Sequence, residues 1–370
     1  MSRVFLVSAR RSAIAPRGGA LAALALHDLA APVILQTLLD AGIKRAWVGE
    51  LILSNALGAG GNPARLAALA AGLPLGVAGL SIDRQCAGGL DALLLGAAMI
   101  RAGQHDIVVA GGAESYSRRP LRLRTHPDGR APEAYDAPPF SPFPDRDPDM
   151  AEAADALGRR MNISRAEQDA WAVESHRKAL AAAPRLCAEI TPIAGLGQDA
   201  FARALGPRLT ARAQIVTGDI TAANMSVAAD GAAFCVLVSE RVARARGFDA
   251  VELIGGATLG DDPAMPGTAP VAAIARALAG AGLRATDLAR SEVMEAFAVQ
   301  AIACQRLAGL DPAVMNLGGG SLARGHPIGA SGAVLAVRLY HELRASGGAG
   351  LAAIAAAGGI GTALVLSFPR

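Results

Sequence analysis

The stretch Arg84-Gln85-Cys86-Ala87-Gly88-Gly89-Leu90 decides the fold of this 370-residue chain. An apolar run over residues 77–82 precedes it and predicts a buried strand. Residues 91–100 are apolar on every face, as expected of a buried helix. Cys86 is therefore expected in a tight strand-to-helix turn, where the helix dipole favours a thiolate and the glycines let a ligand approach closely. The stretch indicates either a nucleophile that attacks acyl groups or a buried structural cysteine.

The composition favours an α/β protein. Hydrophobic residues make up 52% of the chain but aromatic residues only 4%, and there are 43 glycines, so the cores must consist of small aliphatic side chains with tight turns. The length predicts two or three lobes. With a net charge of +3 and 18% charged residues, nucleic acid is not an expected partner.

The cysteines and the hydropathy pattern predict a cytoplasmic protein. The cysteines have no paired spacing, which argues against disulfides and against a metal site; they are Cys86, Cys187, Cys235 and Cys304. No apolar run has the length and purity of a membrane span, so no membrane contact is expected. A strand predicted from residue 3 leaves no room for a signal peptide.

Strands and helices alternate along the chain, which predicts a mostly parallel sheet covered on both faces. Strands are expected at 3–8, 47–55, 77–82, 106–110, 232–238, 251–255, 291–294 and 350–356. Helices are expected at 21–41, 63–71, 91–100, 150–182, 268–281, 297–308 and 333–344. Ser164 and Glu167 have the spacing of a capping box. Residues Arg338, His341 and Glu342 form a polar stripe that predicts partial exposure of the last helix.

The second half of the chain repeats the first in outline. In each half a glycine-rich turn starts a helix, the helix ends in Arg-Ala, and the following strand ends in Gly-Gly, near residues 111–112 and 358–359. This pattern predicts two similar α/β halves with an inserted lobe at about 116–229, a region rich in Arg, Pro and Asp at its start.

The second glycine-rich turn, Gly318 to Gly332, contains His326 between a glycine and a proline. Such a histidine is expected in a rigid, exposed turn, and related halves would bring it to face Cys86. A cysteine beside a histidine is the usual way to obtain a thiolate at neutral pH. The segment lacks a phosphate-loop lysine, and no Gly-x-Gly-x-x-Gly follows the first strand, which argues against a dinucleotide-binding dehydrogenase. The other histidines are expected at the surface or in caps: His27, His105, His126, His176 and His341.

From end to end the chain resembles the thiolases. The matching segments, in order, are 7–14, the Cys86 turn, 106–115, 163–169, 224–226, 230–233, 295–298 and 325–332. The resemblance implies a five-layered α-β-α-β-α fold of two βαβαβαββ halves related by a pseudo-twofold axis. The N-terminal half would comprise 1–115 and 230–250, the loop domain 116–229 and the C-terminal half 251–370. It also implies a homodimer or homotetramer.

The same resemblance implies coenzyme A thioester substrates, with no other cofactor. Cys86 would be acylated, and His326 would activate it and donate to the oxyanion of the substrate thioester. The backbone N–H groups of Cys86 and Ala357 would stabilise the oxyanion of the acyl-enzyme. Ser226 would contact the pantetheine arm, and further substrate contacts would come from Asn224, Gly325 and Phe297.

Two positions depart from the thiolase pattern. The second catalytic cysteine, which acts as acid and base, aligns with Ala355, and the usual Asn or His before Glu295-Ala-Phe is Met294. We therefore expect an acyl-CoA C-acyltransferase of the acetyl-CoA acetyltransferase or β-ketothiolase type whose thiolysis and condensation are weakened. One alternative is an acyltransferase or thioesterase-like enzyme with a different acceptor. The other is a non-catalytic acyl-CoA-binding or complex-forming subunit.

Overall fold

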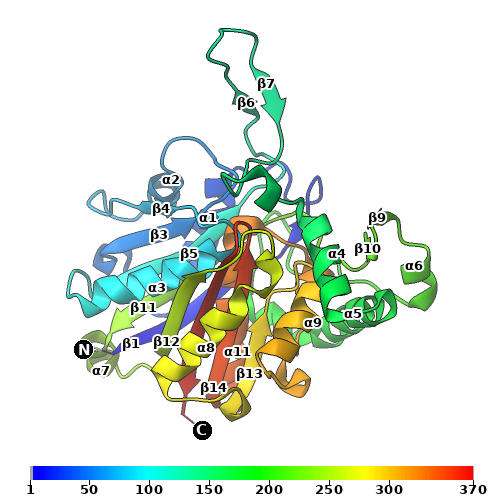
Figure 1. Cartoon of the computed structure of the whole chain (residues 1–370). Helices are drawn as coiled ribbons and strands as arrows, with labels where there is room; N and C mark the ends of the chain where they lie inside the picture. Colours follow the sequence, from blue (N-terminus) through cyan, green and yellow to red (C-terminus); the bar gives the residue numbers. More distant parts are fainter. Residues whose placement is uncertain (1–2, 370) are drawn as a thin grey trace.

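The computed structural model describes residues 3–369 and contains one 11-stranded sheet (Figure 1). Its main path has the order β13 (Leu288–Val293), β14 (Gly348–Ala356), β15 (Ile360–Phe368), β12 (Val251–Gly260), β1 (Val4–Ser12), β11 (Ala229–Ser239), β5 (Ile107–Glu114), β3 (Glu50–Ser54) and β4 (Leu80–Ile82). The short strands β2 (Ala15–Pro16) and β8 (Ile190–Thr191) pair with β11 and β1. The two halves of the chain join where β12 pairs with β1.

The prediction of a mostly parallel sheet is wrong. Parallel pairing is found at β3–β4, β3–β5, β13–β14 and between β1 and the short strand β8, whereas the main path from β14 to β5 pairs antiparallel. The strand β15 returns from β14 through a tight turn, which makes these two strands antiparallel. The strand β11 enters the sheet between β5 and β1 after the helical inserted lobe and runs opposite to both.

Three apolar clusters divide the molecule into five layers. Helices α3 (Gly88–Arg101) and α11 (Ile328–Ser346) lie between the inner faces of the two halves of the sheet. Helices α1 (Leu26–Asp40) and α2 (Pro63–Ala70) cover the outer face of the first half, and α8 (Pro270–Ala281) covers that of the second. This arrangement confirms the predicted α-β-α-β-α layering.

The N-terminal ends of α3 and α11 are in direct backbone contact. A Cβ atom at Gly89 would lie 2.3 Å from the Ala333 nitrogen, and one at Gly332 would lie 2.5 Å from the Leu90 nitrogen. Any side chain at either glycine would therefore force the helices apart. The sequence analysis assigned the glycines after Cys86 to a ligand, but here they allow the close approach of the two central helices.

The inserted lobe comprises a projecting hairpin and a helical part (Figure 1). The hairpin is formed by β6 (Arg122–Arg124) and β7 (Glu133–Tyr135). The helical part contains α4 (Met150–Met161), α5 (Arg165–Leu186) and α6 (Pro207–Ala211), with the small strands β9 (Ile215–Thr217) and β10 (Ile220–Thr221). One helical region was predicted over 150–182, but Asn162 adopts a left-handed conformation and separates α4 from α5, while the capping box at Ser164 is confirmed.

Two short helices were not predicted from the sequence: α7 (Glu240–Arg246) and α10 (Ser321–Arg324). The remaining helix, α9 (Ala298–Leu307), and several of the others differ from the predictions only at their ends. Helix α1 begins at residue 26 rather than 21, and α11 begins at residue 328 rather than 333. Within residues 3–369, every helix is too short or too polar to span a bilayer.

Two residues of the polar stripe on α11, Arg338 and Glu342, are buried, contrary to the prediction of partial exposure, whereas His341 is half-buried. Arg338 is 1% exposed and Glu342 is 6% exposed. Arg338 pairs with Glu342 and with Glu189 of the inserted lobe, and Glu189 also accepts a hydrogen bond from Arg11 Nε at 2.6 Å. A buried charge is tolerated only when it is paired. Of the histidines expected at the surface or in caps, His176 is also buried, at 1% exposure.

Candidate active site

Cys86 lies in a 3₁₀ helix of one turn, Gln85–Ala87, which leads into α3. The preceding Gln85 has a φ of 49°, a left-handed conformation that is uncommon for a residue with a side chain. The Cys86 Sγ atom lies 3.2 Å from His326 Nε2, although the two residues are 240 positions apart. The structure thus brings together the two residues that the sequence analysis paired.

The hydrogen bonds of His326 fix its tautomer. His326 Nδ1 lies 2.6 Å from Ser331 Oγ, and Ser331 Oγ donates to the Pro327 carbonyl oxygen at 3.0 Å. A hydroxyl carries only one proton, so Ser331 must accept from Nδ1–H. We therefore assign the proton to Nδ1. Nε2 then has a free lone pair directed at the Cys86 sulfur, as a general base requires.

Burial makes both partners neutral at rest. Burial raises the pKa of Cys86 to about 12, and the Glu114 and Asp83 carboxylates act in the same direction, against the backbone N–H groups of Cys86 and Ala357. Burial also lowers the pKa of His326 to about 4. The expectation of a resting thiolate at the helix end therefore differs from the structure, because desolvation outweighs the helix dipole. The pair is a thiol next to a neutral imidazole.

A cavity of about 590 Å³ opens next to this pair. Its walls are mainly apolar and come from both halves and from the inserted lobe; they include Leu57, Phe140, Met150, Leu157, Met225, Phe297 and Ile328. Its polar lining residues, besides Cys86 and His326, include Asp83, Gln85, Tyr116, Arg122, Asp136, Ser226 and Gln300. An apolar cavity with few polar groups beside a nucleophile is the usual form of a small-molecule site.

The other residues singled out from the sequence divide into two groups. Ser226, Phe297, Ala355 and Ala357 line the cavity, whereas Asn224, Gly325 and Met294 lie outside the lining.

Asn224 shapes the loop that carries Ser226. Its side chain is fully buried, accepts from the Thr221 N–H at 2.8 Å and donates to the Asp219 carbonyl oxygen at 3.0 Å. Ser226 donates to the Glu295 carbonyl oxygen. Gly325 has a φ of 105°, and the next residue, His326, donates its backbone N–H to the Val227 carbonyl oxygen at 2.8 Å. This backbone contact fixes the histidine turn against the inserted lobe.

Met294 and Ala355 bring no proton-transfer group to the site. Met294 is buried, with its Sδ atom 3.3 Å from Ser321 Oγ, and Ala355 faces the cavity near the end of β14. In the described part of the chain, Cys86 is the only cysteine that lines the cavity. Cys304 is buried in α9 and Cys235 in β11, and Cys187 is exposed.

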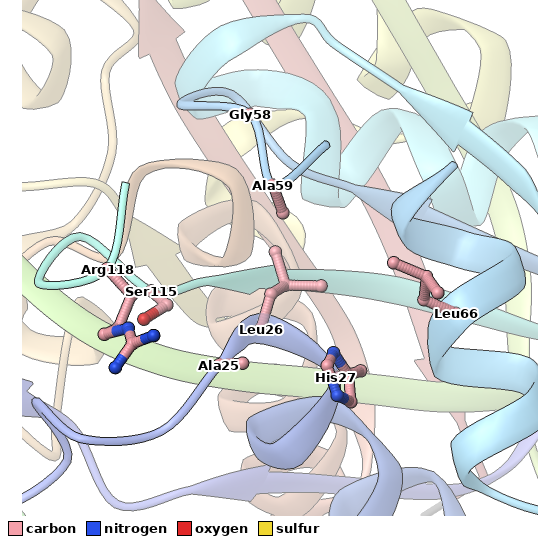
Figure 2. A pocket seen from close by; sticks show the side chains of 8 residues that line it. All are labelled: Ala25, Leu26, His27, Gly58, Ala59, Leu66, Ser115 and Arg118. Carbon is pink, nitrogen blue, oxygen red and sulfur yellow. The ribbon is translucent and has the colours of Figure 1, made fainter. Parts of the chain in front are cut away.

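A second, smaller pocket shares no lining residue with the catalytic cavity (Figure 2). It has a volume of about 200 Å³ and is lined by Ala25, Leu26, His27, Gly58, Ala59, Leu66, Ser115 and Arg118. Ser115 donates to the Leu24 carbonyl oxygen, so its hydroxyl is engaged. No three His, Cys, Asp or Glu side chains within residues 3–369 are grouped as a metal site would require.

Sequence reasoning missed Ser331 and Glu114. Ser331 lies five residues after His326, in the first turn of α11, which begins two residues after the histidine. Glu114 ends a fully buried strand, and a charged residue at the end of an apolar run signals a specific partner. Its carboxylate accepts from the Gly329 N–H at 2.9 Å, and burial raises its pKa to about 7.

Comparison with known proteins places this geometry among the thiolases. The family model "Thiolase, N-terminal domain" matches residues 4–241, and "Thiolase, C-terminal domain" matches residues 249–368. A putative acetyl-CoA C-acetyltransferase of Bacillus subtilis is 39% identical, over 97% of this chain and 98% of its own length. An acetyl-CoA acetyltransferase of Pseudomonas aeruginosa is 38% identical, over 99% of this chain and 100% of its own.

Solved structures give the same result. The crystal structure of the Bacillus anthracis acetyl-CoA acetyltransferase superposes with a TM-score of 0.94 at 33% identity, covering 100% of this chain and 99% of the other. The human mitochondrial 3-ketoacyl-CoA thiolase, solved in complex with CoA, superposes with a TM-score of 0.93 at 29% identity, covering 100% and 98%.

Proposed function

Because the chain belongs to the thiolase family and is an acyltransferase of the acetyl-CoA acetyltransferase/3-ketoacyl-CoA thiolase type, we propose that it works through an acyl-enzyme on Cys86. The substrate is a coenzyme A thioester. The observation that carries the proposal is the 3.2 Å separation of Cys86 Sγ and the unprotonated Nε2 of His326. Residues held this way serve as nucleophile and base.

The first half-reaction follows from the protonation states. Sγ attacks the thioester carbonyl carbon while its proton passes to His326 Nε2. Because the Cys86 pKa is high and the His326 pKa is low, this proton leaves as the new C–S bond forms. The tetrahedral intermediate then expels the CoA thiolate, which takes the proton back from His326. The products are the Cys86 thioester and free CoA.

Two backbone N–H groups support the oxyanion. Those of Cys86 and Ala357 both act against the rise of the Cys86 pKa, which supports a position close to the reacting sulfur. In the acyl-enzyme the thioester oxygen occupies this region, and paired backbone donors stabilise the negative charge that develops there.

The second half-reaction of a thiolase is weakened in this chain. It needs a group that removes a proton from the α-carbon or from the incoming thiol, and Ala355 has none. Loss of a general acid/base costs roughly 10²–10⁴ in rate. Met294 donates no hydrogen bond, and loss of one oxyanion donor costs about 10²–10³.

A different acceptor is the second candidate, and Ala355 favours it. Water, or a nucleophile or carbon acid that brings its own base, would accept the acyl group without help from residue 355. A purely binding subunit is disfavoured, because it would not need the Cys86–His326 pair. The homodimeric or homotetrameric state and the cytoplasmic location stay predictions.

The test is mass spectrometry of the intact protein after incubation with acetyl-CoA and longer acyl-CoAs, beside an assay of acetoacetyl-CoA thiolysis. We expect an acyl adduct on Cys86, absent in Cys86→Ala, and slow thiolysis. An adduct that decays to free acid would establish water as the acceptor. No adduct with any acyl-CoA would overturn the proposal and favour the non-catalytic subunit.

A further inference from the structure

Two buried carboxylates outside the proposed chemistry hold the two sides of the segment that carries His326. We call residues 320–329 the His326 segment. Glu114 ends β5, and Glu295 follows β13; they are 0% and 1% exposed. Neither lines the cavity. A fully buried carboxylate is costly unless donors surround it, so its partners indicate what it does.

Glu114 fixes the C-terminal side of the His326 segment to the cavity wall. Its Oε2 atom accepts from the Gly329 N–H at 2.9 Å and from the Ala56 N–H at 3.0 Å. The other oxygen accepts from the Asn55 side chain and, at 3.4 Å, from the Leu57 N–H. Ala56 and Leu57 both line the cavity. One side chain therefore joins the start of α11 to the loop after β3.

Glu295 fixes the N-terminal side. Its Oε2 atom accepts from the Leu322 N–H at 3.4 Å and from the Ser175 hydroxyl at 2.7 Å, and Ser175 in turn accepts from the Gly320 N–H at 2.9 Å. Its Oε1 atom accepts from Asn316 Nδ2 at 2.9 Å and from Trp171 Nε1 at 3.1 Å. The His326 segment is thereby tied to the inserted lobe.

We propose that Glu114 and Glu295 are positioning residues that together hold His326 Nε2 within reach of the Cys86 sulfur. The inference rests on the proposed function. All eight direct partners are neutral N–H or O–H donors, so each site fits a group that only accepts. A glutamine at either position would turn an NH₂ group toward backbone donors. The loops would then move apart.

The test compares Glu114→Gln and Glu295→Gln with the unchanged protein in two reactions of Cys86. The first is acylation by acetyl-CoA, followed by rapid quenching and mass spectrometry. The second is alkylation by iodoacetamide at neutral pH. A small displacement of a catalytic group costs up to about 10²-fold, so we expect both rates to fall by about 10- to 100-fold. The acetyl-CoA concentration that gives half-maximal acylation should be unchanged.

Glu292→Gln is the matched control. Glu292 is a buried glutamate in β13 that forms an ion pair with Arg338. It accepts no hydrogen bond from the His326 segment and acts on that segment only through the charge of Arg324. We expect its acylation and alkylation rates to equal those of the unchanged protein. Glu114→Asp and Glu295→Asp keep the charge and shorten the side chain. They replace a glutamine variant that does not fold, and their acylation and alkylation should also be slower than in the unchanged protein.

The sign of the alkylation rate separates positioning from simple electrostatics. The Glu114 charge raises the pKa of Cys86, so removing that charge alone would speed alkylation in Glu114→Gln. Alkylation as fast as or faster than in the unchanged protein would overturn the inference. If no acyl-CoA acylates the unchanged protein, the proposed function fails, whereas the alkylation comparison still tests the two glutamates.

Discussion

The turns before α3 and α11 and the ends of β13 and β14 meet at the same site, yet they differ in chemistry. The two turns carry Cys86 and His326 at hydrogen-bonding distance. The two strand ends carry Met294 and Ala355, whose side chains have no group that could transfer a proton. In the proposed function, the groups for acylation and those for deacylation thus come from different elements. One half-reaction can weaken while the geometry of the other is kept.

The largest expected effect comes from restoring the missing acid/base. Ala355→Cys should raise acetoacetyl-CoA thiolysis by about 10²–10⁴-fold, because residue 355 faces the cavity beside the Cys86 turn. Ala356→Cys, which adds a thiol at the adjacent position, should gain much less. Normal acylation of Cys86 with no gain in thiolysis would show that a thiol at residue 355 does not supply the missing acid/base.

The next effect concerns the hydrogen-bond donor missing at the end of β13. In the Ala355→Cys background, Met294→Asn should raise thiolysis further, by up to about 10², since one oxyanion donor is worth this much. Met294→Leu, which keeps an apolar side chain, should change the rate little. Equal rates for the two variants would show that residue 294 does not reach the reacting oxygen. The measurement is again the initial rate of acetoacetyl-CoA cleavage.

A smaller effect, a loss of acylation rate, is expected when His326 of the Cys86–His326 pair loses its hydrogen-bond partner. Ser331→Ala removes the acceptor of His326 Nδ1–H, so both tautomers become populated and fewer molecules have a basic Nε2. A lost hydrogen bond of this kind lowers the acylation rate by about 10-fold. Ser331→Thr keeps the hydroxyl and should retain most of the rate. Acylation by acetyl-CoA, followed by mass spectrometry, measures both variants, and an unchanged rate in Ser331→Ala would contradict the tautomer assignment.

The smallest expected effect is on stability. It concerns Glu292 in β13, two positions before Met294. Burial raises the pKa of Glu292 from 4.5 to about 7. The folded protein therefore binds this proton more tightly than the unfolded chain, so the stabilisation is complete below pH 4.5 and is lost as the pH rises through about 7. Glu292→Gln should be more stable than the unchanged protein at pH 8, by about 1–3 kcal/mol. Urea unfolding at pH 5 and pH 8 measures this, and a gain of equal size at both values would exclude Glu292 as the titrating group.

Local sequence patterns predicted that Cys86 and His326 lie together, because each residue lies in its own glycine-rich turn. The five layers were predicted from the resemblance, whereas the order of strands and helices alone predicted a mostly parallel sheet. What the patterns could not supply were partners from distant parts of the chain. The burial of Arg338 depends on Glu189, which is 149 positions away, and Glu114 binds Gly329 across 215 positions. The high pKa of Cys86 depends in the same way on the final packing.

The contact between α3 and α11 has a consequence for the newly made chain. Ribosomes add about 5–20 residues per second. Because His326 lies 240 positions after Cys86, Cys86 leaves the ribosome roughly 10–50 s before His326. Throughout this interval the thiol has no base. A chain that stops early would carry the cysteine but could not capture acyl groups from the CoA pool. The Cys86–His326 pair thus forms only after nearly all of the polypeptide has been made.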